Sequence, residues 1–322
     1  MNRNTFNSII VLTLILGLFL ACGNKPKNTK AEQDYQRAAR YFFADASFSP
    51  ILNEALDVFL YSSPLDTLEA NYTDEQEAVK KLMKLETWLA FTSRDLTENE
   101  KQSLRDRKYM PRSIIIAYDG LALIVNNANP DTCITVNDFR RILKGEISEW
   151  RQLNPTSRLG NIDVVFDNPL SSTVRWCVDS LLGGQEMKAP NVGAVKTSAA
   201  VIDYVERHHN ALGIIGSNWL NDSRDSTNVT FKKNITVMGV SRLDSATRAN
   251  SWKPYQYYLY NGNYPLLRTI YALLNEPRTG LPSNFAHFCR LPKGQLIIQK
   301  SGLLPIQAAT NVRNIYVNYG NK

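Results

Sequence analysis

The chain has 322 residues, of which 37 are Lys or Arg, 30 are Asp or Glu and 43% are hydrophobic. This length is enough for two lobes or one large domain around a sizeable core, which excludes an intrinsically disordered chain and a disulfide-dense miniprotein. The net charge of +7 is spread along the sequence and forms no block of Lys and Arg of the kind typical of nucleic-acid binders, so no nucleic-acid partner is expected.

The first 21 residues have the pattern of a lipoprotein signal peptide. Arg3 precedes an apolar run over residues 9–20, which is too short to span about 30 Å of hydrocarbon as a helix and suits the core of a secretory signal. The run ends in Ala21 and Cys22 and resembles a bacterial lipobox, although Phe19 stands where an aliphatic residue is usual. We expect cleavage before Cys22 and acylation of this residue, which anchors the protein to a membrane. The alternative is a weak membrane anchor with an incidental cysteine.

Residues 22–33 are predicted to be the acylated cysteine and a flexible tether. This segment is polar and carries Lys25, Lys27 and Lys30. The globular part is expected to begin near Gln33. The sequence thus predicts a lipoprotein of the cell envelope that faces the periplasm and is held through Cys22.

After the tether, strand and helix patterns alternate. The longest strand signal covers residues 113–126 and is broken by Asp119 and Gly120, which suggests a segment that leaves one sheet and enters another. The alternation predicts an α/β protein with mainly parallel sheets, and no internal repeat is found. Strands are expected at 41–44, 88–91, 162–166, 211–215 and 235–240, and helices from Pro50 and at 74–84, 136–143, 174–181, 197–207, 264–274 and 284–291.

Enzymatic and metal-binding motifs are absent from the sequence. Besides Cys22 there are three cysteines, Cys133, Cys177 and Cys289, so at most one disulfide can form, and their spacing does not suggest zinc. The sequence has no H-E-x-x-H, G-x-S-x-G or G-x-x-x-x-G-K-[ST] motif. We therefore expect no metal site, no cofactor and no enzymatic activity.

A series of motifs in order from about residue 40 to 305 resembles the PstS-like phosphate-binding proteins of ABC transporters. The motifs are SRDLTENE (93–100), IAYDGLALIVN (116–126), ITVNDF (134–139), ILKGEISEW (142–150), ALGII (211–215), YPLLR (264–268), GQLII (294–298) and GLLP (302–305). Each motif is weak alone, and their order and coverage make the resemblance specific.

The resemblance implies a two-lobed periplasmic binding protein type II fold, with a ligand cleft between the lobes and closure by hinge motion. Two segments would cross between the lobes, near Gly120 and near 231–236. Lobe 1 would comprise residues 34–120 and 233–322, and lobe 2 residues 121–232. The implied ligand is inorganic phosphate or a similar oxyanion, delivered by a monomeric protein to the membrane subunits of an ABC permease.

Two helix starts carry hydroxyl groups that suit an oxyanion, because unpaired N–H groups and the positive end of the helix dipole lie there. Ser47 and Phe48 precede the helix at Pro50, and Ser171, Ser172 and Thr173 precede the helix at 174. One start lies in each implied lobe, so closure would bring both onto one anion. The alternative is that these residues are ordinary helix caps.

Charged residues near the strand ends supply the other candidates. Ser93 and Arg94 follow an apolar strand, where Arg94 is a candidate bidentate clamp for the anion or else a surface charge. Asp119 is the candidate acceptor for the proton of monohydrogen phosphate, which sulfate lacks. Asp45 and Asp95 are alternative acceptors, and Asp119 is alternatively a turn residue.

The loop before Ser171 departs from the family pattern. Many members have an Arg shortly before Ser-Gly-Thr, whereas this chain has Asp167 in that loop and Ser172 in place of the Gly. Arg175 is a candidate to replace the missing charge, or a surface residue. Asp167 would oppose anion binding unless it faces away.

Two other functions remain open from the sequence. A bilobal ligand sensor or interaction lipoprotein without a transport role would keep the same fold. A serine hydrolase using Ser171 or Ser172 is weaker, because no positioned His is near them in the sequence.

Overall fold

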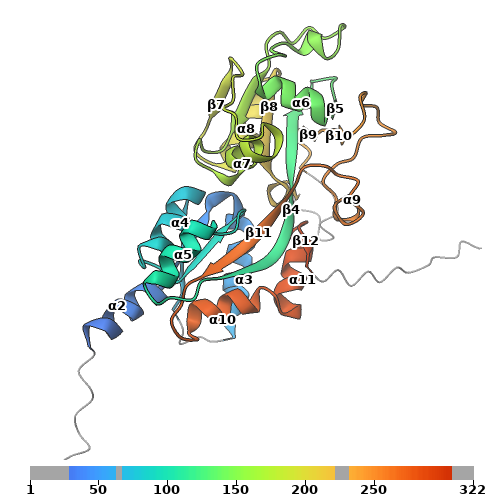
Figure 1. Cartoon of the computed structure of the whole chain (residues 1–322). Coiled ribbons are helices and arrows are strands. Elements are labelled where there is room, and N and C mark those ends of the chain that lie inside the picture. The colour runs from blue at the N-terminus through green and yellow to red at the C-terminus, as the bar shows by residue number, and fades with distance from the viewer. Residues whose placement is uncertain (1–28, 63–66, 222–231, 307–322) are drawn as a thin grey trace, which may run out of the picture. The chain divides into compact units, whose positions relative to one another are not determined.

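A computed structural model describes residues 29–62, 67–221 and 232–306 (Figure 1). The predicted signal peptide, Cys22 and the tether up to residue 28 lie outside the described residues. From Lys30 the chain is already helical in α2 (Lys30–Ala39), so the last residues of the predicted tether are not extended. The Thr29 hydroxyl accepts from the Glu32 N–H at 3.3 Å and caps this helix. Among the described residues, no helix is both long and apolar enough to cross a membrane.

The first lobe is built on parallel strands that pack against helices. Strand β1 (Tyr41–Asp45) pairs in parallel with β2 (Glu69–Thr73) and β3 (Leu89–Thr92). The helices α3 (Ser49–Tyr61), α4 (Glu75–Met83) and α5 (Glu98–Asp106) alternate with these strands. Leu52, Phe42, Phe91 and Phe285 belong to its buried apolar core, so both ends of the chain contribute to this lobe.

Strand β4 (Arg112–Asn126) runs through both lobes, as Figure 1 shows. Its first half pairs with β11 (Leu267–Leu274) and with β12 (Leu304–Pro305), and its second half pairs with β8 (Ala211–Gly216) and β9 (Ile235–Val237). The partners change around Gly120, where a Cβ atom would lie 2.7 Å from Pro254, so only glycine fits. The predicted break at Asp119 and Gly120 is therefore a change of partners within one continuous strand.

The second lobe surrounds the second half of β4. Strand β6 (Asp163–Phe166) pairs in parallel with β8 and β7 (Val192–Ala194), and β5 (Cys133–Thr135) forms a separate parallel pair with β10 (Gly239–Ser241). Its helices are α6 (Val136–Leu143), α7 (Ser172–Trp176) and α8 (Ser198–Arg207), and α7 continues as a π-helical turn over Cys177–Leu181. Trp150, Phe139 and Phe166 fill one of its cores.

The last described elements, from β11 onward, return to the first lobe. Helix α9 (Gln256–Tyr260) precedes β11 and contributes Leu259 to the second-lobe core, and α10 (Leu281–Phe288) and α11 (Pro292–Lys300) follow β11. Helix α10 lies slightly upstream of the helix predicted at 284–291, and α11 was not predicted as a separate helix. The described cysteines Cys133, Cys177 and Cys289 are all free thiols.

Residues 264–274, predicted to be helical, contain strand β11. Its apolar residues also match helical spacing, but exposed and buried residues alternate over much of the strand, and Thr269, Ile270 and Tyr271 favour an extended chain. Strand β11 lies between β3 and β4 and is antiparallel to both. The strands of the first lobe, which we call the first sheet, are therefore mixed and not purely parallel.

The strand pairing puts the second crossing later in the chain than the predicted 231–236. Phe231 lies outside the described residues, while β9 and β10 pair with β4 and β5 in the second lobe. Met238, Tyr264 and Leu266 belong to a second-lobe core. The chain re-enters the first sheet at β11, where Leu267 pairs with Gly120, because that strand completes the pairing of β3 and β4.

Candidate functional site

A buried guanidinium group lies where the two lobes meet. Arg268 and Asp119 are cross-strand partners on β11 and β4, and both are almost completely buried. The Arg268 Nε lies 2.9 Å and its Nη2 2.7 Å from Asp119 Oδ2. The Arg268 Cζ also lies 4.7 Å from the centre of the Phe48 ring, at cation–π distance. A charge buried to this extent needs such partners, and here they fix the direction of the guanidinium.

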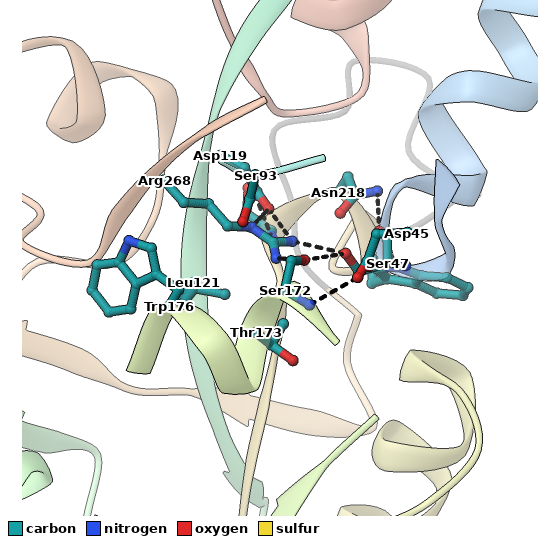
Figure 2. Close-up of polar contacts among 12 residues, drawn as sticks. Asp45, Ser47, Ser93, Asp119, Leu121, Ser172, Thr173, Trp176, Asn218 and Arg268 are labelled. Atoms are coloured by element: carbon teal, nitrogen blue, oxygen red, sulfur yellow. Dashed lines mark hydrogen bonds and ion pairs between the residues drawn. The ribbon is translucent and has the colours of Figure 1, made fainter. Parts of the chain in front are cut away.

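Two hydroxyls, one from each lobe, receive the other N–H groups of Arg268 (Figure 2). Arg268 Nη1 donates to Ser172 Oγ at 2.7 Å, and Nη2 donates to Ser47 Oγ at 3.2 Å. The two hydroxyl oxygens lie 3.3 Å apart. Ser47 belongs to the short 3₁₀ turn before α3, and Ser172 is the first residue of α7. Both predicted helix starts therefore meet at one guanidinium.

The Asp45 carboxylate bridges the backbones of the same two serines. Its Oδ1 accepts from the Ser47 N–H at 2.9 Å, and its Oδ2 accepts from the Ser172 N–H at 2.8 Å. Burial, followed by the negative charge of Asp167, raises the pKa of Asp45 to about 6, and the charge of Arg268 opposes this rise. Asp45 was predicted only as an alternative to Asp119, and it is the carboxylate that contacts both helix starts.

The end of β8 holds Asp119 and the Ser47 backbone in place. Asp119 Oδ1 accepts from the Ser217 N–H at 2.9 Å and from its hydroxyl at 2.7 Å. Asn218 Nδ2 and Trp219 Nε1 donate to the Ser47 carbonyl oxygen at 3.1 and 2.8 Å. A Cβ atom at Gly216 would lie 2.8 Å from Arg268 Nη2, so glycine permits this close approach. The four residues 216–219 follow the ALGII motif directly, and no site role was predicted for them.

The hydroxyls of Ser171 and Thr173 face Asp167. They donate to its Oδ1 at 2.7 and 2.6 Å, and Ser198 donates to its Oδ2 at 3.1 Å. Asp167 thus orders the loop that leads into α7 and has hydroxyl partners of its own. Of the three predicted hydroxyls at this helix start, only that of Ser172 contacts Arg268.

A second polar contact between the lobes lies at Glu75, which is buried at the start of α4. Its Oε1 accepts from the Ser93 N–H at 2.5 Å, and its Oε2 pairs with Arg175 Nε. Arg175 Nη2 also donates to the Ser93 hydroxyl at 2.6 Å, and Nη1 pairs with Asp179 at 2.7 Å. The predicted candidates Ser93 and Arg175 are therefore brought together, but their polar atoms bind each other and Glu75.

Arg94 and Asp95 lie in a separate network. Both terminal nitrogens of Arg94 bind Glu100, at 2.7 and 2.8 Å, and Asp95 pairs with Lys101 at 2.9 Å and with the Ser113 hydroxyl. Neither residue contacts the cluster at Arg268, because these partners hold them. We call this cluster the Arg268 group, and its members are Asp45, Ser47, Asp119, Ser172 and Arg268. The guanidinium that contacts both helix starts is that of Arg268, which lies in the YPLLR motif and was not among the predicted site residues.

The sequence and the fold of this chain are similar to those of known proteins. A phosphate-binding protein PstS of Staphylococcus haemolyticus is 20% identical over 232 residues, which cover 72% of this chain and 69% of that protein. A Clostridium perfringens structure described as a phosphate ABC transporter substrate-binding protein with bound phosphate has a TM-score of 0.69 at 21% identity and covers 84% of this chain and all of its own. An ABC-type phosphate transport receptor from Vibrio cholerae has a TM-score of 0.61 at 22% identity, covering 82% and 98%.

These structures share the two-lobed periplasmic binding protein fold expected from the sequence. The family model of the PBP superfamily domain matches residues 43–290, which include Asp45, Asp119, Ser172 and Arg268. The chain therefore belongs to the PBP superfamily.

Proposed function

We propose that this protein binds inorganic phosphate between its lobes, at the Arg268 group, and delivers it to an ABC permease. The observation that carries the proposal is the Arg268 guanidinium, which is fully buried and directed at one hydroxyl from each lobe. A buried oxyanion requires several donors, and a guanidinium with two hydroxyls supplies them from fixed positions. The names of the relatives as phosphate-binding proteins support the same ligand.

An anion between Ser47 and Ser172 would replace the 3.3 Å contact between their hydroxyl oxygens. Both hydroxyls and both terminal nitrogens of Arg268 would then donate to its oxygens. Because Ser47 and Ser172 belong to different lobes, the anion would hold the lobes together. This links ligand binding to the closed arrangement.

Asp45 is the proposed acceptor for the proton of monohydrogen phosphate. Each oxygen of Asp119 already accepts from two groups, Oδ1 from the Ser217 N–H and hydroxyl and Oδ2 from two nitrogens of Arg268, whereas each oxygen of Asp45 accepts from one N–H of the described residues. Asp45 is buried and lies beside both serines. Its carboxylate would accept a hydrogen bond from the protonated oxygen of phosphate and would repel sulfate, which has no proton at neutral pH. The proton-acceptor role that the sequence suggested for Asp119 is thus proposed for Asp45.

The charge balance near the site also favours a ligand that can donate a proton. Asp45, Asp119, Asp167 and Glu75 outnumber the guanidiniums of Arg268 and Arg175. A fully ionised anion gains little electrostatic stabilisation from such surroundings, so its binding would depend on directed hydrogen bonds. This is consistent with selection by hydrogen-bond pattern and not by charge alone.

The proposal includes a non-enzymatic monomer outside the cytoplasm, anchored through acylated Cys22. The sequence pattern of residues 1–22 supports the anchor. In the described part of the chain, neither Ser171 nor Ser172 has a hydrogen bond to a histidine, which gives no support to a serine hydrolase. The sensor without a transport role has no observation in its favour.

Titration calorimetry of the chain without residues 1–22 tests the ligand. We expect phosphate to release binding heat and sulfate to release little. Asp45→Asn should narrow the difference between the two anions, because the amide no longer repels sulfate. The absence of heat with phosphate, molybdate and sulfate would contradict the proposal.

A further inference from the structure

A second cavity, outside the Arg268 group, lies beside α6 and α7. Its volume is about 390 Å³, and its lining comes from the second lobe and from the segment that leads into β11. We call it the Arg140–Arg242 cavity after its two charged residues. The other lining residues that matter to the argument are Asn137, Trp176, Leu181 and Leu266.

The two guanidiniums of this cavity have backbone and amide partners only. Arg140 Nε donates to the Leu181 carbonyl at 2.9 Å and its Nη1 lies 3.5 Å from Asn137 Oδ1, while Arg242 Nη2 donates to the Gly262 carbonyl at 3.1 Å. Within the described ranges, neither forms an ion pair with a carboxylate. Arg140 Nη2 and Arg242 Nε and Nη1 have no hydrogen bond to a described residue, so donors from two side chains remain available at one cavity.

Three other arginines near the contacts between the lobes form ion pairs with carboxylates, unlike Arg140 and Arg242 within the described residues. Arg268 binds Asp119, Arg175 binds Glu75, and Arg94 binds Glu100. Two guanidiniums that share a cavity repel each other in the absence of an anion. An anionic ligand would relieve this repulsion and form charge-assisted hydrogen bonds with both.

Apart from Asn137 and Ser180, the remainder of the lining is apolar. The indole of Trp176 is held by a hydrogen bond from its Nε1 to the Leu267 carbonyl at 3.1 Å, and Leu181 and Leu266 are buried core residues. A volume of about 390 Å³ lies in the range of sites for small molecules and far exceeds the needs of a bare oxyanion. The chemistry of the lining thus combines cationic donors with an aromatic face.

We propose that the Arg140–Arg242 cavity is a second binding site, distinct from the Arg268 group, for a small organic anion. Its carboxylate or phosphate-ester group would bind the two guanidiniums, and its apolar part would pack against Trp176. This site does not depend on the identity of the anion at Arg268.

The test uses benzoate as the probe and the full chain, with and without inorganic phosphate in molar excess. Ligand-observed NMR should detect benzoate binding, and the indole N–H signal of Trp176, assigned by its loss in Trp176→Phe, should shift on titration. Benzamide has the same shape without the charge and should not bind. Arg140→Gln and Arg242→Gln should each weaken benzoate binding about tenfold.

Arg158→Gln is the matched control, because Arg158 is exposed and lies outside this lining. It should bind benzoate like the unaltered chain. Arg242→Gln carries little folding risk, since Arg242 is exposed and has one backbone partner, and unchanged phosphate titrations would show that both cavity variants remain folded. The proposal is overturned if benzoate does not bind, if phosphate displaces it, or if Arg242→Gln leaves its affinity unchanged.

Discussion

Two of the polar contacts between the lobes, the one at Arg268 and the one at Glu75, differ in whether an anion can enter them. The Arg268 group contains two hydroxyls in contact with each other, so an oxyanion can enter between them and keep every donor satisfied. The Glu75–Arg175 contact is a direct ion pair, and each guanidinium nitrogen of Arg175 already binds a side chain, namely Glu75, Asp179 or Ser93. If the proposed function is correct, the first contact selects the ligand and the second stabilises the closed arrangement.

Removing the guanidinium from the first contact should have the largest effect. Arg268→Met leaves Asp119 buried without its cation, which should lower the free energy of unfolding by about 3–5 kcal/mol and abolish phosphate binding. Urea denaturation and titration calorimetry measure the two effects. Replacing both partners in Arg268→Met/Asp119→Leu should recover part of the stability but none of the binding. Phosphate binding within a few-fold of normal in the single variant would place the ligand elsewhere.

Breaking the second contact should lower stability with little change in selectivity. Arg175→Met leaves Glu75 with only the Ser93 N–H as its partner, and since Arg175 is partly exposed the loss should be smaller, about 1–3 kcal/mol. The ratio of phosphate to sulfate affinity should stay the same. Arg141→Met, which breaks surface pairs with Asp138 and Glu146, is the control and should cost about 1 kcal/mol or less. Complete loss of phosphate binding in Arg175→Met would mean that Arg175 binds the ligand, as the sequence suggests.

Ser171 and Ser172, neighbours at the start of α7, allow a direct test of which hydroxyl binds the anion. Ser172→Ala removes a hydroxyl that contacts Arg268 and should weaken phosphate binding by about 1–3 kcal/mol. Ser171→Ala removes a hydroxyl that faces Asp167 and should affect binding less. Calorimetric titration of both variants under the same conditions decides between them. Equal effects would mean that the loop acts as a unit and that the Arg268 group does not define the site.

Local signals account for the parts of the site that the sequence predicted. Ser47 lies in the turn before α3, Ser172 is the first residue of α7 and Asp119 stands at the change of partners in β4, so each could be found from a few neighbouring residues. The alternation of strands and helices likewise predicted the α/β fold, because the hydrophobic period is a local property.

The missed parts depend on pairing between distant segments. Arg268 lies in 264–274, whose spacing predicts a helix, and only the antiparallel pairing of β11 with β4 sets it opposite Asp119. Arg175 is bound by Glu75, which lies 100 residues earlier and has no local relation to it. Whether a polar side chain is free for a ligand thus depends on tertiary contacts that no single segment encodes.

The smallest effect should be the pH dependence that Asp45 gives to folding. Its pKa is raised from 3.8 to about 6 by burial and by the charge of Asp167, with Glu75 adding to the rise and Arg268 opposing it. Between these values the folded chain holds a proton that the unfolded chain has released. The free energy of unfolding should therefore fall as the pH rises through this window, by at most about 1.4 kcal/mol per pH unit.

Asp45→Asn should flatten this part of the profile, because the amide does not titrate. The variant also loses one of two acceptors, so its stability should be lower overall, and the slope is the informative quantity. Urea denaturation across the window measures it, with Asp203→Asn, an exposed carboxyl on α8, as the control that keeps the slope. If Asp45→Asn keeps the normal slope, the titration belongs to another group. Asp45 would then be charged throughout the window, and its proposed part in accepting the phosphate proton would rest on geometry alone.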